Sequence, residues 1–148
     1  MRPRVLSDLD AARICLGNQE AETFLALWGA YVHAIDDIVD GDTTSKESII
    51  RAFAQAAVLY SSPFYRQHCD RLQLIVLLVT STYADSVHWE GSKEEWKRQY
   101  SDVMRHAGAE MLRATLLICG GYDHLRQFSA ELHAANYYQH HDDAGKVT

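Results

Sequence analysis

The sequence predicts an all-α protein built as a single bundle of five to six helices. Apolar residues recur at spacings of three and four, and no segment alternates with period two over a useful length. Only two prolines and eight glycines interrupt the chain, so long helices can form. The 148 residues suit one domain, and no linker or internal repeat divides them. We therefore expect one helical domain over residues 1–148, with a polar tail that frays from about residue 140.

The first half of the chain predicts three helices. A short helix starts at Ser7 and ends near Gly17. The second runs from about Gln19 to Asp40, and a capping box, Thr44-Ser45-Lys46-Glu47, starts a third helix that ends at about Tyr60. The second helix carries one apolar stripe, formed by Phe24, Trp28, Tyr31, Ile35 and Ile38.

The second half predicts two or three further helices. Ser62 and Pro63 restart the chain as cap and first helical residue, and this fourth helix reaches about Glu90. Because its middle is apolar on all sides, we place it at the centre of the bundle. A second capping box begins at Ser92. The fifth helix has a stripe of Trp96, Tyr100, Val103, Ala107, Met111, Ala114 and Ile118.

Glycines divide the last part of the chain. Gly120-Gly121 ends the fifth helix, and a sixth covers roughly His124 to Tyr138. Short loops between the helices make antiparallel neighbours, which is typical of a bundle.

Charge and cysteine content limit the classes of partner and compartment. The net charge of −6 argues against binding to nucleic acid or to an anionic membrane. The most apolar run, Leu72 to Val79, is too short to span a bilayer. Three widely spaced cysteines, Cys15, Cys69 and Cys119, suggest buried free thiols. With no apolar signal core after the basic N-terminus, we expect a cytoplasmic protein.

An acidic segment at the end of the second helix is the strongest chemical signal. With about 100 degrees per residue, Asp40 lies about 40 degrees and Asp37 about 100 degrees from Asp36. Such close carboxylates repel one another, and acidic groups oppose the dipole at a helix C-terminus. A divalent cation removes this cost, and magnesium accepts one or two carboxylates together with substrate phosphates. We expect Asp36, Asp37 and Asp40 to bind magnesium, with manganese as a substitute; a solvated acidic surface is the alternative.

Small and polar residues occupy the same arc of the helix. His33 lies among the carboxylates, and Gly29 and Ala26 follow one and two turns back. We expect these three residues to border a substrate pocket.

The residues around this segment resemble a known family. Phe24-Leu25-Ala26-Leu27-Trp28, followed by His33-Ala34-Ile35-Asp36-Asp37-Ile38-Val39-Asp40-Gly41, resembles the first aspartate-rich motif of isoprenoid synthases, above all of the squalene and phytoene synthase branch. The stretch from Tyr100 to Gly108 weakly resembles a later helix of that branch. The resemblance implies a fold that is terpenoid-synthase-like in part, and magnesium ions that bind a substrate diphosphate. The chain is shorter than these relatives and has no second DDxxD, so a homodimer could complete the cavity.

Two other helical faces carry candidate ligands. On the fifth helix, Asp102, His106 and Glu110 share an arc of about 80 degrees, which suits a second cation or, alternatively, an exposed polar face with ion pairs. On the fourth helix, Asp85 follows the apolar run and is a candidate to approach the second-helix carboxylates; the alternative is that the helix emerges into solvent at this point. The tail residues Asp142-Asp143 are a further substitute for a second motif.

Three functions remain open from the sequence. The first is an enzyme, or a former enzyme, that binds or turns over an isoprenoid diphosphate with magnesium. The second is a helical nucleotide pyrophosphohydrolase, which also places carboxylates around magnesium but uses glutamate pairs that have no clear counterpart here. The third is a non-enzymatic interaction or assembly module whose acidic face binds a basic partner, with Tyr137-Tyr138 at an interface.

Overall fold

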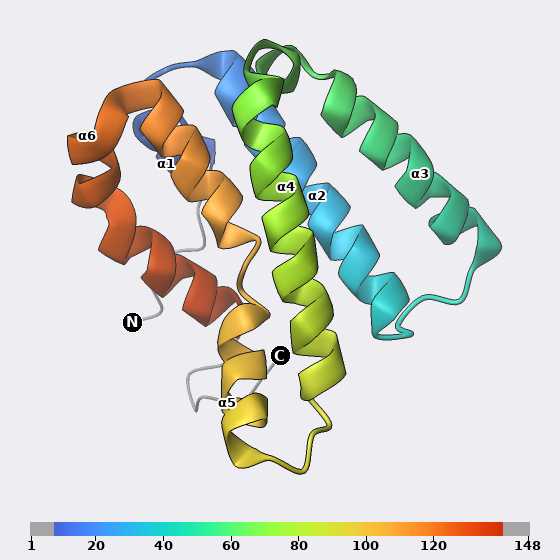
Figure 1. The fold of residues 1–148 in the computed structure, drawn as a ribbon. Coiled ribbons are helices and arrows are strands. Elements are labelled where there is room, and N and C mark those ends of the chain that lie inside the picture. Colours follow the sequence, from blue (N-terminus) through green and yellow to red (C-terminus); the bar gives the residue numbers. More distant parts are fainter. Residues whose placement is uncertain (1–7, 141–148) are drawn as a thin grey trace.

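The computed structural model describes the backbone of residues 8–140 and the side chains of residues 11–136. In this part of the chain six helices pack as a bundle, and no strand occurs (Figure 1). The predicted tail from about residue 140, with Asp142-Asp143, lies outside the described residues, as do the side chains of Tyr137 and Tyr138. The helices are α1 (Asp8–Ile14), α2 (Gln19–Val39), α3 (Lys46–Ser61), α4 (Pro63–Trp89), α5 (Glu95–Met104) and α6 (Ala109–His140).

Side-chain hydrogen bonds fix where α2 and α3 begin. The Asn18 side chain accepts from the Ala21 amide at 3.0 Å, which satisfies a free donor of the first turn of α2. The Ser45 hydroxyl group accepts from the Ser48 amide at 3.3 Å, so α3 is capped one residue later than the predicted box at Thr44. Ser62 precedes Pro63 as predicted, but its hydroxyl group donates to the Leu59 carbonyl at 2.6 Å and so closes α3.

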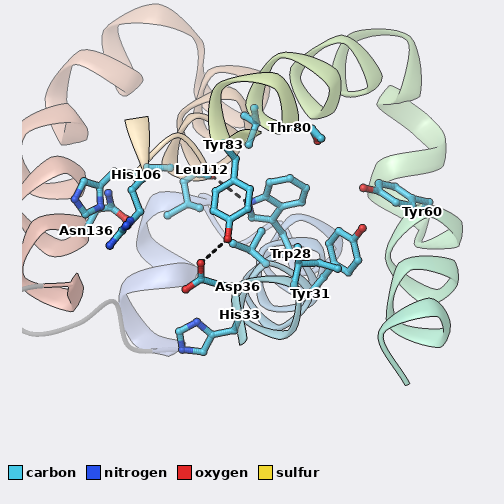
Figure 2. Close-up of a pocket in the computed structure, with 17 residues that line it drawn as sticks. Trp28, Tyr31, His33, Asp36, Tyr60, Thr80, Tyr83, His106, Leu112 and Asn136 are labelled. Carbon is cyan, nitrogen blue, oxygen red and sulfur yellow. Dashed lines mark hydrogen bonds between the residues drawn. The ribbon is translucent and has the colours of Figure 1, made fainter. Parts of the chain in front are cut away.

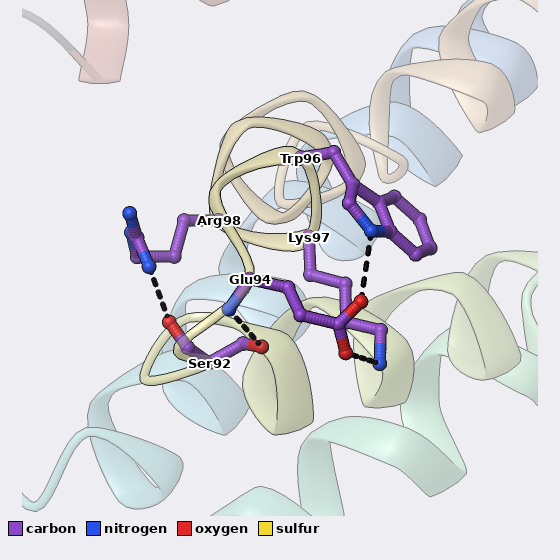
Figure 3. Close-up of polar contacts among 5 residues, drawn as sticks. All are labelled: Ser92, Glu94, Trp96, Lys97 and Arg98. Atoms are coloured by element: carbon purple, nitrogen blue, oxygen red, sulfur yellow. Dashed lines mark hydrogen bonds and ion pairs between the residues drawn. The ribbon is translucent and has the colours of Figure 1, made fainter.

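The start of α5 differs from the predicted capping box (Figure 3). Ser92 lies before the helix, where its hydroxyl group accepts from the Glu94 amide at 3.1 Å. The Glu94 carboxylate accepts from Trp96 Nε1 at 2.9 Å and pairs with Lys97. Arg98 donates to the Ser92 carbonyl at 2.6 Å. These contacts form a compact turn, so the cap position is occupied by Glu94.

The sequence predicts one continuous fifth helix, and this prediction is wrong. The chain leaves the helical conformation over residues 105–108, between α5 and α6. Amides here bond to carbonyls three residues back, as from His106 to Val103 and from Ala107 to Met104. The Gly108 carbonyl group accepts from Trp28 Nε1 at 3.1 Å. A Cβ at Gly108 would lie 3.7 Å from Val32, so α2 packs closely against this break. Apolar residues keep their helical spacing through the break, so the sequence pattern does not reveal the break.

The glycine pair Gly120-Gly121 bends α6 into two parts. The bend lies where the sequence predicts the boundary between two helices. Gly121 has φ +82° and ψ −176°, a conformation that only glycine adopts readily. The His124 ring packs against Gly120, where a Cβ would meet it at 2.4 Å. Because α6 turns back at this point, its second part lies along the same end of the bundle as α1 (Figure 1).

Two long-range contacts connect α1 to the second part of α6. Arg13 forms an ion pair with Glu131. His124 Nε2 donates to the Ile14 carbonyl oxygen at 2.6 Å. Beside them, Cys15 is fully buried, and this burial raises the pKa of its thiol to about 12.

The core lies between α2, α4 and α6, with α4 in contact with four other helices as predicted for a central element. Its largest fully buried side chains include Phe24, Phe64, Leu59, Leu72 and Met111. The outward face of α4 differs from the prediction, because Leu74, Leu77 and Leu78 are about three-fifths exposed (61%, 61% and 60%). Among the described helices, none is long and apolar enough to cross a membrane.

Candidate functional site

A cavity of about 220 Å³ lies where α2, α3 and α4 meet the break before α6 (Figure 2). Four aromatic side chains form much of its wall: Trp28, Tyr31, Tyr60 and Tyr83. The Tyr31 and Tyr60 rings meet edge to face, with centroids 6.0 Å apart. Burial, followed by the neighbouring Tyr31, raises the pKa of Tyr60, so its hydroxyl group stays neutral. This part of the wall therefore combines aromatic rings with the neutral hydroxyl group of Tyr60.

Asp36 brings a negative charge into this aromatic wall. Its carboxylate accepts a hydrogen bond of 2.6 Å from the Tyr83 hydroxyl group of α4, and Figure 2 shows the two side chains facing each other. Burial and this bond both raise the pKa of Tyr83. The bond occupies one carboxylate oxygen of Asp36, and the other oxygen could accept from a ligand or bind a cation.

Asp40 and Arg105 add opposite charges near Asp36. Desolvation, followed by the Asp36 charge, raises the pKa of Asp40, and Arg105 acts in the opposite direction. The Asp40 side chain is exposed, so solvent screens these effects. Arg105 lines the cavity and forms an ion pair with Glu90 at 2.5 Å. The guanidinium group of Arg105 therefore lies close enough to the acidic end of α2 to interact with it electrostatically.

Of the other residues predicted on the arc of α2, all are exposed and only some line the cavity. Gly29 and His33 line the cavity, and a Cβ at Gly29 would meet no atom within 4 Å. Asp37 and Ala26 are exposed and do not line it. The Asp37 backbone carbonyl group instead accepts from the Asp42 and Thr43 amides and ends the helix. The structure therefore brings Asp36, Gly29 and His33 to the cavity, with Asp40 nearby.

A second cavity, of about 760 Å³, lies between α4, α5 and α6. It is lined by all three residues of the predicted second polar site on the fifth helix: Asp102, His106 and Glu110. Glu110 forms an ion pair with Arg113 at 2.9 Å. His106 lines both cavities. Across the described residues, no three His, Cys, Asp or Glu side chains converge closely enough to hold a metal ion by themselves.

Asp85 is exposed and lines neither cavity, and Tyr83 approaches Asp36 in its place.

A signal for Tyr83 was present in the sequence. Leu72, Val79, Tyr83 and Ser86 follow one another at spacings of seven, four and three, which puts Tyr83 on the inner face of α4. Arg105 gave no such signal, because a continuous fifth helix hides the break that brings it to the cavity.

Comparison of the chain with protein-family models, with curated proteins and with solved structures finds no match.

Proposed function

We propose that the protein binds an isoprenoid diphosphate at the acidic end of α2, with magnesium as the bridging ion. The observation that carries this proposal is the position of Asp36, a carboxylate within the wall of an aromatic cavity. A ligand that fits such a site has a charged head and an apolar tail. The volume of about 220 Å³ is below the roughly 300–1,000 Å³ of typical small-molecule pockets, which favours a short prenyl chain.

The side chains fit a magnesium ion that is shared with its substrate. Asp36 and Asp40 are close enough for one charge to raise the pKa of the other, and a cation between them would relieve that repulsion. Magnesium often takes one or two protein carboxylates and completes its shell with phosphate oxygens and water. Asp36 and Asp40 would thus be the protein ligands, with manganese as a substitute. Asp37, which lies about 100 degrees from Asp36 around the helix, would act through bound water.

The remaining side chains supply binding and shielding. When bound, magnesium would neutralise the diphosphate and make it a better leaving group. Arg105 would donate to the phosphate oxygens, since a guanidinium group matches them well. The Tyr83 hydroxyl group would hold Asp36 in one orientation. Trp28 and Tyr31 would cover the apolar tail and limit the access of water.

A thermal melt with Mg²⁺, inorganic diphosphate and both together tests the proposal. A ligand at about 100 times its Kd stabilises the folded state by about 2.7 kcal/mol, a shift of several degrees in Tm. We expect this shift for the wild type with both additives and its loss in Asp36→Asn, which keeps the shape and an acceptor oxygen for Tyr83. Asp70→Asn, an exposed position on α4, is the matched control. Equal shifts in both variants would contradict the proposal.

Prenyl diphosphates then test the apolar part of the ligand. Dimethylallyl diphosphate with Mg²⁺ should shift Tm more than inorganic diphosphate does, and Tyr31→Ala should remove only the extra shift. If both ligands act equally, the aromatic cavity does not contribute to binding and the isoprenoid part of the proposal fails.

A non-enzymatic interaction module is the second candidate. The observation in its favour is the number of large apolar side chains that stay exposed on α3, α4 and α5, among them Phe53 at 74% and Val103 at 69%. A protein that shows no response to magnesium, diphosphate or prenyl diphosphate would favour this function.

A further inference from the structure

The outward face of α4 carries an apolar stripe that no other described helix covers. Leu74, Leu77 and Leu78 are 61%, 61% and 60% exposed, although they belong to the helix that contacts most of the bundle. In Figure 1, α4 crosses in front of α2, and no helix lies in front of it. His68 interrupts the helical conformation near the start of α4, so the stripe lies on the regular part that follows.

The exposed surface continues across the second cavity. Leu78 lines that cavity together with Val103 of α5 and Leu117 of α6, which are 69% and 45% exposed. Five such side chains expose on the order of 500 Å² of apolar surface. A standard interface buries roughly 800 Å² per subunit, of which about 60% is apolar. The apolar area exposed on this face is therefore of the same order as the apolar area that one subunit buries in a standard interface.

Two opposite charges flank the stripe symmetrically. Arg71 and Asp85 lie seven residues before and seven residues after Leu78. Seven residues make almost two turns, so both side chains lie within about 20 degrees of Leu78 on the helix surface and about 10 Å from it along the axis. Both residues are exposed, and neither forms a salt bridge within the described part of the chain.

We propose that two copies of the chain pair through α4, antiparallel and centred on Leu78. A two-fold axis at Leu78 would bring Arg71 of each copy opposite Asp85 of the partner subunit, so that the two charge pairs close both ends of an apolar contact. A parallel pairing would instead bring Arg71 to Arg71 and Asp85 to Asp85, which costs free energy at both ends. The charge pattern therefore selects the antiparallel arrangement. This inference does not depend on the proposed function.

Charge reversal combined with sedimentation equilibrium on the full chain tests both the dimer and its register. Arg71→Glu and Asp85→Arg should each weaken the dimer by at least about tenfold, since each creates two like-charge contacts. The double variant Arg71→Glu/Asp85→Arg restores both pairs and should regain the wild-type Kd within about threefold. Arg126→Glu, at an exposed position on α6, is the control and should leave the dimer unchanged.

Leu78→Lys tests the centre of the contact and should give a monomer whose helical circular dichroism and Tm match the wild type, since the residue is already exposed. A wild-type protein that stays monomeric up to several hundred micromolar overturns the proposal. So does a dimer that resists both single reversals. A dimer that dissociates with Phe53→Lys but not with Leu78→Lys would place the contact on α3 and would also refute the pairing through α4.

Discussion

The Tyr83 hydroxyl group donates a hydrogen bond of 2.6 Å to the Asp36 carboxylate and so joins α4 to the acidic end of α2 across 47 residues of sequence. Tyr83→Phe removes the donor and little else. Because hydrogen bonds to charged groups are worth about 1.5–3 kcal/mol and this one is partly exposed, we expect a loss of about 1–2 kcal/mol in the free energy of unfolding by urea. Tyr122→Phe, at an exposed position on α6, should change it little. A loss equal in both variants would show that the bond is not stabilising.

The contribution of Asp40 to the free energy of unfolding should fall as the pH rises, which is the opposite of the usual behaviour of an aspartate. Its pKa in the folded protein is raised above 3.8 by desolvation and then by Asp36, so the folded state binds the proton more tightly than the unfolded state does. This contribution to stability is present below pH 3.8 and is lost as the pH rises through the raised pKa. Asp40→Asn should therefore be more stable than the wild type at about pH 7, with a smaller difference at about pH 3.

Urea unfolding of both proteins at the two pH values measures the effect, with Asp123→Asn, an exposed aspartate of α6, as the control. If Asp40→Asn is less stable than the wild type at neutral pH, the carboxylate makes a favourable contact and the predicted sign is wrong.

The bend in α6 should depend on Gly121 because of its backbone conformation. Gly121→Ala forces a Cβ into the region at φ +82° and ψ −176°, and we expect a loss of about 1–3 kcal/mol. Gly29→Ala is a matched control within the helical part of α2, where a Cβ meets nothing within 4 Å. That change should stabilise by about 0.5–1 kcal/mol. Chemical unfolding of the two variants should thus give shifts of opposite sign, and equal signs would contradict this account of the bend.

Trp28 should hold the break before α6 against α2. Its indole group is buried and donates to the Gly108 carbonyl at 3.1 Å, so Trp28→Phe loses both the donor and part of the packing. We expect destabilisation of about 2–3 kcal/mol. Amide hydrogen exchange should also become faster over residues 105–111. Faster exchange spread evenly over the whole chain would indicate a general loss of stability with no special effect on the break.

Helix boundaries marked by local chemistry could be predicted from the sequence. Asn18, Pro63 and Gly121 each act through their own backbone or side chain, so their positions are visible without the fold. The break over residues 105–108 was not visible, because it rests on contacts of Gly108 with Trp28 and Val32, about 80 residues earlier. Tertiary packing overrides a continuous apolar period at this point.

The candidate site was predictable only on one helix. The arc of α2 groups Gly29, His33 and Asp36, which line the same cavity, since helical geometry relates residues that are close in sequence. It could not show which residues of the arc reach the cavity, and Asp37 does not line it. The partners from other elements, Tyr83 and Arg105, depend on how α4 and the break are placed, and no spacing within α2 contains that information.

The contacts between α1 and the second part of α6 have a consequence for synthesis on the ribosome. Ile14 bonds to His124 and Arg13 pairs with Glu131, so each contact joins residues more than a hundred positions apart. Translation adds roughly 5–20 residues per second, and α1 therefore leaves the ribosome several seconds before its partners are made. During that interval Ile14 and Cys15 lack the cover that α6 later gives them. The nascent chain must keep this apolar segment from other contacts until the second part of α6 has been translated.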